Sequence, residues 1–190
     1  MLKPGVMQLW GPLPTEDYRA EIAGAVVRTV DVGAQFMVSG ALDKAASAAG
    51  VCCEGAGALG LVTGACFSLR LARERLLIVS DNEEAFAPGW HDDGYAVTSM
   101  SGALVVFEIA GQSAIEIVKR ATALPLREPG RSAAVSFAGA NVYLYRFGDE
   151  STIRLHIDRG LAGYLWQWFE ELDRLTAVEE GRAQESLRPE

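Results

Sequence analysis

The order of strand-like and helix-like segments is the feature that most limits how this chain can fold. Residues 34–39 (AQFMVS) are a short apolar strand candidate, and residues 42–49 (LDKAASAA) have the alanine-rich composition of a helix that Gly50 would end. Two more strand candidates follow, because apolar and polar residues alternate over 66–71 and the segment 76–79 is continuously apolar. The first part of the chain therefore has the order strand, helix, paired strands.

The second part of the chain repeats this order. Apolar residues favour strands at 94–98 and 103–109, and those of 113–120 share one face of a helix. A loop with two prolines follows this helix. After the loop come three strand candidates at 133–137, 142–147 and 152–157, and a closing helix at 160–175. Because strands and helices are interspersed in this way, we expect an α+β fold with mixed or antiparallel sheets and helices on one face.

Composition suggests where these parts begin and end. Residues 1–33 contain three prolines and are expected to form an N-terminal arm. The polar connector WHDD ends a first α+β half at 34–93, and a second half follows at 94–175. Residues 176–190 are rich in Glu, Arg, Ser and Pro and are expected to be a frayed tail.

The charge balance argues against two classes of partner. The net charge is −8, the chain has only three lysines, and its arginines are scattered. Binding to nucleic acid or to anionic membranes requires clustered Lys and Arg, so neither is expected. The sequence has neither a signal-peptide pattern nor an apolar run of about 20 residues, the length of a membrane span, and we expect a cytoplasmic protein.

The glycine cluster at 55–60 (GAGALG) matches the letters of a dinucleotide-binding loop. Such a loop needs a hydrophobic strand before it and a helix after it. Here a short run ending in Glu54 precedes the cluster, and a strand pattern follows it. A flexible loop is therefore favoured, and no cofactor-binding residue is expected in this chain.

Cysteine and histidine are too few and too scattered to predict a catalytic or metal site. Cys52 and Cys53 are adjacent and lack the CxxC spacing, and Cys66 stands alone. His156 lies between apolar residues of a strand pattern, and His91 lies in the polar connector. We expect no catalytic residues and no metal ligands.

Aromatic residues gather in the closing helix. Trp168 lies on the apolar stripe of that helix, where packing in the core is the more probable role. Tyr164 shares this face one turn earlier, whereas Trp166 points elsewhere and fits the core and an interface about equally. Together with Trp10 in the proline-rich start, Tyr164 and Trp166 are the candidate partner-interface residues.

The second half also resembles a known family. Residues 101–111 (SGALVVFEIAG) are similar to the strand-then-glycine opening of folate-dependent aminomethyltransferase-type domains, and 112–122 to the helix after it. Residues 124–126 (LPL) are similar to the Cys-Pro-Leu-Asp-Leu stretch of sarcosine oxidase gamma subunits. The segment 153–169 (IRLHIDRGLAGYLWQWF) resembles the closing strand and Tyr-Leu-Trp-x-Trp signature of those subunits and is the most specific match.

Weaker matches extend the resemblance upstream. Residues 35–40 resemble the first strand of the gamma subunits and 67–79 their strand pair, so the likeness covers roughly 35–172. Two departures stand out: residues 72–75 (ARER) replace the usual Pro-Asp-Glu-Trp turn, and Gly160 stands where Ser is common.

This resemblance implies both a fold and a role. It implies two ferredoxin-like, βαββ-type halves, and a small subunit that carries no cofactor and packs on the large alpha subunit of heterotetrameric sarcosine oxidase. In that oxidoreductase complex FAD, FMN, NAD and tetrahydrofolate belong to the other subunits. The complex oxidatively demethylates sarcosine to glycine and passes the methyl carbon to tetrahydrofolate, which places the family in sarcosine catabolism.

Two alternatives remain. A stand-alone folate-binding protein related to aminomethyltransferases would need a carboxylate aimed at the pterin, and Asp92, Asp93 and Glu108 are the candidates. A thiol or redox enzyme would use Cys52, Cys53 or Cys66.

Overall fold

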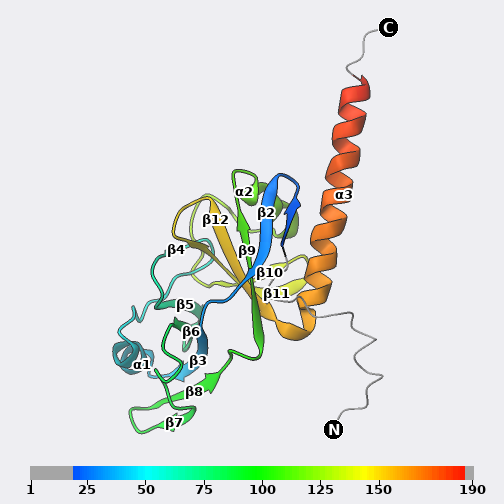
Figure 1. Ribbon diagram of the computed structural model, residues 1–190. Coiled ribbons are helices and arrows are strands. Elements are labelled where there is room, and N and C mark those ends of the chain that lie inside the picture. The colour runs from blue at the N-terminus through cyan, green and yellow to red at the C-terminus, as the bar shows by residue number, and fades with distance from the viewer. Residues whose placement is uncertain (1–18, 187–190) are drawn as a thin grey trace, which may run out of the picture.

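Two β-sheets lie face to face, with helices on their outer faces (Figure 1). The computed structural model describes the backbone of residues 19–186 and the side chains of residues 19–178. Sheet A contains, in spatial order, β1 (Arg19–Ile22), β2 (Ala25–Val30), β9 (Leu104–Ala110), β12 (Thr152–Asp158), β11 (Ala140–Phe147) and β10 (Ala134–Phe137). The two-residue strand β4 (Leu61–Val62) pairs in parallel with the end of β11, whereas the other pairings of this sheet are antiparallel.

Sheet B is antiparallel throughout. Its order is β5 (Phe67–Ala72), β6 (Arg75–Ser80), β3 (Ala34–Gly40), β8 (Tyr95–Ser99) and β7 (Gly89–His91). The helices are α1 (Leu42–Ala49), α2 (Ala114–Ala121) and α3 (Ala162–Ser186), and the short 3-10 turn η2 (Arg159–Leu161) leads into α3. Gly50 ends α1 in the left-handed conformation expected for that position, with φ of 67°.

Three groups of buried side chains hold these layers together. The first lies between sheet A and helices α2 and α3, and includes Phe107, Phe137 and Phe169. The second lies between sheet B and α1, and the third fills the space between the two sheets, where Leu69 and Leu77 pack near Tyr145. The order of layers is therefore helix, sheet, sheet, helix.

Each half of the chain contributes a hairpin to the sheet of the other half. The hairpin β1–β2 precedes β3 along the chain, yet β2 pairs with β9 of sheet A. The hairpin β7–β8 precedes β9, yet β8 pairs with β3 of sheet B. The two halves are interlocked as a result.

The expected α+β class, with antiparallel sheets and helices on one face of each, is confirmed. The expected boundaries need correction, because residues 19–30 of the supposed arm form β1 and β2, and β8 joins the sheet of the first half. Residues 1–18 lie outside the described part of the chain. The supposed frayed tail is helical as far as Ser186, since α3 continues through it.

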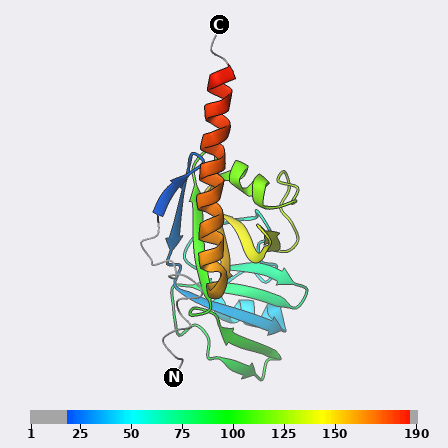
Figure 2. The same ribbon diagram turned by 90° about the vertical axis from the view of Figure 1, so that its right-hand side faces the viewer.

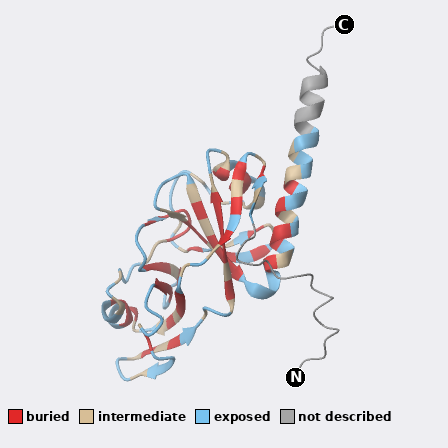
Figure 3. Ribbon diagram, viewed as in Figure 1, coloured by how far each residue is buried: buried red, intermediate tan, exposed pale blue. Residues whose placement is uncertain are grey.

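Helix α3 begins against sheet A and then extends beyond it. In Figure 2 its C-terminal turns rise clear of both sheets. Figure 3 shows the change along the helix, from buried positions near its start to mostly exposed positions further along.

Candidate functional site

A buried polar chain joins the two sheets. His156 of β12 donates from Nδ1 to Gln35 Oε1 of β3 over 2.6 Å, and His156 Nε2 accepts from the Tyr145 hydroxyl of β11 at 3.0 Å. All three side chains are buried. Burial, with a smaller effect from the charge of Arg154, lowers the pKa of His156 to about 3, and burial raises the pKa of Tyr145. The imidazole is therefore neutral and serves as a connector between the sheets.

Glu108 of β9 is held between two arginines. Arg28 of β2 donates from Nε and Nη2 to Oε1 at 2.8 and 2.6 Å, and Arg154 of β12 donates from Nε to Oε2 at 2.8 Å. The Arg154 guanidinium also lies 3.5 Å from the centre of the Phe147 ring. Burial would raise the pKa of Glu108, but the hydrogen bonds and charges of the two arginines lower it. Glu108 is thus an ionised partner within sheet A and is not aimed at a ligand.

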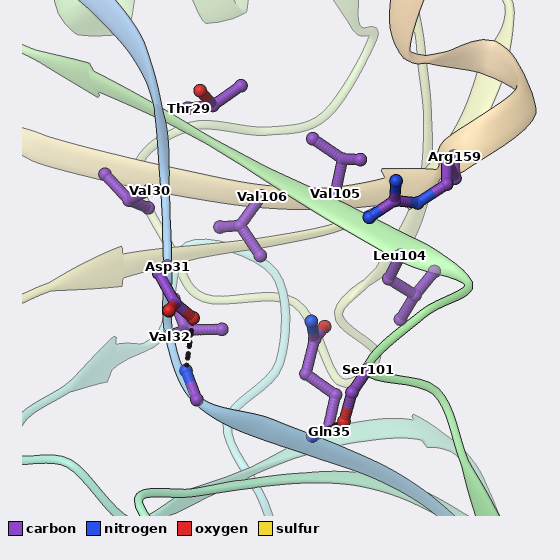
Figure 4. Close-up of a pocket in the computed structure, with 11 residues that line it drawn as sticks. Thr29, Val30, Asp31, Val32, Gln35, Ser101, Leu104, Val105, Val106 and Arg159 are labelled. Atoms are coloured by element: carbon purple, nitrogen blue, oxygen red, sulfur yellow. Dashed lines mark hydrogen bonds between the residues drawn. The ribbon is translucent and has the colours of Figure 1, made fainter. Parts of the chain in front are cut away.

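Two hollows lie where the chain crosses from one sheet to the other. One of about 150 Å³ lies where the chain crosses from β2 to β3, lined by Asp31, Gln35, Ser101 and Arg159 among others (Figure 4). Ligand pockets usually measure about 300–1,000 Å³, so this hollow is too small for a pterin or a nucleotide. A second hollow of about 350 Å³, at the lower end of that range, also borders the segment from Asp31 to Gly33. The arginine that lines it is Arg154, which is already paired with Glu108.

The glycine cluster is a close-packed connector and not the flexible loop expected from the sequence. Ala58 N donates to Ser132 O and Gly130 N to Ala58 O, and Ala56 pairs with Leu69 of β5. A Cβ at Gly57 would lie 1.6 Å from Gly130 O. The glycines of this segment therefore allow backbones to approach closely.

The cysteines, histidines and candidate carboxylates do not converge on one site. No group of three or more His, Cys, Asp or Glu side chains in the described residues could hold a metal ion. Cys52, Cys53 and Cys66 are exposed thiols, and Cys66 Sγ donates to Asp81 Oδ1 over 3.2 Å. Asp92 and Asp93 occupy an exposed turn, whereas Glu108 is buried in sheet A.

The candidate interface residues of the closing helix have different environments. Trp166 is only 6% exposed, stacks on Phe107 with ring centroids 6.3 Å apart, and donates from Nε1 to Glu170. Its assignment to an interface is thereby corrected, because it packs within the chain's own core. Tyr164 is 48% exposed and donates its hydroxyl to Ala138 O at 2.5 Å. Trp10 lies outside the described residues.

The large apolar side chains exposed on the described surface lie in three places, one of which is Leu61 of β4. Leu161 at the end of η2 and Tyr164, Leu175 and Val178 of α3 form the second, which we call the α3 face. The third place is Trp90 of β7, which is 71% exposed. Trp90 was not identified from the sequence as an interface residue, because it lies in the polar connector WHDD. A tryptophan in so polar a segment was the available signal, since monomeric proteins rarely leave this side chain in water.

Helix length and polarity bear on a membrane location. None of the described helices has the length and apolar character that crossing a bilayer requires.

Comparisons with known proteins reveal the fold. No protein-family model and no curated protein sequence matches the chain. One similar solved structure is a chain of the heterotetrameric sarcosine oxidase from Corynebacterium sp. U-96, solved in complex with pyrrole 2-carboxylate. The match has a TM-score of 0.65 and 17% identity, and it covers 89% of this chain and 93% of that chain. The two chains therefore share their fold over nearly their whole lengths and are similar in size.

Proposed function

We propose that this chain is a non-catalytic, gamma-type subunit of a sarcosine oxidase-like flavoenzyme and packs on the large subunit. The observation that carries the proposal is the fold match, which covers almost all of a similarly small chain from a heterotetrameric sarcosine oxidase. The segments of the second half that resemble gamma subunits are independent support from the sequence.

The surface of the chain is consistent with packing against another subunit. The α3 face presents Leu161, Tyr164, Leu175 and Val178 to solvent, and the helix that carries it extends beyond the sheets. Exposed apolar side chains grouped on one side of a helix commonly mark a protein–protein interface. In this proposal FAD, FMN, NAD and tetrahydrofolate are bound by the other subunits, and the large subunit covers the α3 face.

The test is to isolate the tagged full chain from its own cells and identify what accompanies it. We expect a yellow complex that contains a large subunit and an FAD-carrying subunit, and that consumes oxygen when sarcosine is added. A colourless chain that purifies alone and binds tetrahydrofolate in titration calorimetry would overturn the proposal in favour of a stand-alone folate-binding protein.

A further inference from the structure

Part of the inner face of sheet B is not covered by sheet A. Leu77 of β6, Met37 of β3 and Thr98 of β8 are cross-strand neighbours and share this face. Leu77 is fully buried, Met37 is half-buried and Thr98 is exposed. The cover that sheet A provides therefore ends between β3 and β8.

Trp90 stands on this uncovered part. It pairs with Ala96 of β8, which in turn pairs with Ser39 of β3, so these three side chains lie on the inner face. We call Trp90, Ala96, Thr98 and Ser39 the open face of sheet B. Figure 1 shows the hairpin β7–β8 at the end of the molecule away from the free end of α3.

Contacts of its neighbours hold the backbone of the hairpin at Trp90. The ring of the next residue, His91, stacks on Tyr95 with centroids 4.5 Å apart and donates from Nε2 to Ala87 O at 2.8 Å. Gly94 N donates to His91 O and closes the turn at 2.9 Å. Because the backbone at Trp90 is held, binding has to order only the side-chain torsions of the indole, which suits an interface anchor.

The charge of this region indicates what would cover it. Asp92 and Asp93 form the exposed turn immediately after Trp90 and its neighbour. The chain has no Lys or Arg from residue 76 to residue 118, a stretch that includes the whole hairpin. Arg75 pairs with Ser39 at the far end of the row from Trp90 and donates from Nε to Ser39 Oγ over 3.4 Å. Lys44 lies on α1, which covers the opposite face of sheet B. A partner with basic side chains would complement the acidic turn.

We propose that the open face of sheet B is a second docking surface, where Trp90 enters an apolar pocket of a partner subunit and Asp92 and Asp93 face its Lys and Arg side chains. This inference rests on the proposed subunit role and names a contact separate from the α3 face. A second copy of this chain is disfavoured as the partner, because a two-fold contact would bring the two acidic turns together.

The experiment measures binding of the full chain to the remaining subunits, purified from cells that lack it. We expect Trp90→Ala to weaken binding by about 30-fold or more, as the loss of a central anchor does. We expect Asp92→Asn with Asp93→Asn to slow association at low salt, with a smaller effect at high salt. The thermal midpoint of each variant alone should match that of the parent chain, since these side chains are exposed.

Two control variants match these changes elsewhere. Leu61→Ala removes another exposed apolar side chain, and Glu128→Gln with Glu150→Gln removes the same charge from exposed loops. Both controls should bind within about two-fold of the parent chain, as exposed positions away from an interface usually do.

The outcomes separate the two proposals. If the parent chain binds the flavin-carrying subunits and Trp90→Ala binds equally well, the docking surface is refuted and the subunit role stands. If the parent chain does not bind them, the subunit role fails and this inference falls with it. If the chain instead forms a dimer that Trp90→Ala abolishes, the open face binds a second copy, and the proposed basic partner is excluded.

Discussion

At the scale of single residues, Gly57 is the glycine, among those that the structure describes, where an added side chain would meet the closest contact. A Cβ there would lie 1.6 Å from the carbonyl oxygen of Gly130, so one of the two backbones would have to move. We expect Gly57→Ala to lower the free energy of unfolding by about 3 kcal/mol, because overpacking against backbone cannot be relieved by a rotamer change. Denaturant unfolding followed by circular dichroism measures this loss.

Gly102 provides the matched control for that substitution. Nothing lies within 4 Å of a Cβ built there, and its φ is not in the left-handed region. Gly102→Ala should therefore leave stability unchanged or raise it by up to about 1 kcal/mol, because alanine restricts the unfolded chain. Equal losses at Gly57 and Gly102 would contradict the close packing seen at Gly57.

His156 predicts how stability depends on pH. Its pKa is about 3 in the folded chain, mainly because the ring is buried, and about 6.5 when the chain is unfolded. Between these values the unfolded chain binds one more proton than the folded chain. Stability from this group is therefore fully present above about pH 6.5 and falls by about 1.4 kcal/mol per pH unit below it.

The measurement is the free energy of unfolding from pH 7.5 down to 4.5, which spans the pH range where the loss due to His156 begins. In His156→Gln the slope due to this residue should disappear, whatever the variant's stability at neutral pH. Glu108 adds a loss of the same sign at lower pH, because its pKa is also lowered. A variant that keeps the parent's slope would show that another group titrates.

At the scale of elements, α3 changes from a core helix to an exposed one within a single turn. Leu172 is 6% exposed and packs in the core of sheet A, whereas Leu175 is 60% exposed. We expect Leu172→Ala to reduce stability by about 2–5 kcal/mol and Leu175→Ala by at most about 0.5 kcal/mol. Thermal or denaturant unfolding of the two variants tests this directly, and a similar loss in both would mean that the chain itself covers Leu175.

Local patterns predicted most elements but not their partners. The strands at 34–40 and 152–158 and the helix at 42–49 follow from residue alternation and propensity, which act within a few residues. The hairpin β1–β2 was missed because its turn, Ala23–Gly24, lacks the usual Asn-Gly signal, although φ is positive at both positions. Its partner β9 lies about 80 residues further along the chain, and no local pattern specifies that pairing.

The candidate site was predictable only in part. Helical spacing placed Tyr164 on the face of the core residue Trp168, yet Tyr164 is 48% exposed. The burial of Trp166, off that face, depends on Phe107, a residue of a distant strand. The exposure of Trp90 depends on where sheet A stops covering sheet B, which is a property of the assembled sheets. Position on a helix face is thus encoded locally, whereas exposure is decided by tertiary packing.

At the scale of the whole molecule, the exchanged hairpins make the two halves one unit. Hairpin β1–β2 completes the sheet of the second half and β7–β8 that of the first, and the core between the sheets draws side chains from both. Gln35 and His156 add a buried hydrogen bond across the same interface. Neither half can bury its own apolar surface without the other.

This interlocking predicts a single cooperative unfolding event. In native-state hydrogen exchange followed by mass spectrometry, we expect the slowest amides of β3 in sheet B and β9 in sheet A to exchange with the same free energy, that of global unfolding. Leu77→Ala removes a fully buried side chain from the core between the sheets, and we expect it to lower that free energy by about 2–5 kcal/mol. The loss should appear equally in β3 and β9, although Leu77 belongs to sheet B. If protection fell in β3 while β9 kept its original value, the sheets would unfold independently and the exchanged hairpins would not couple them.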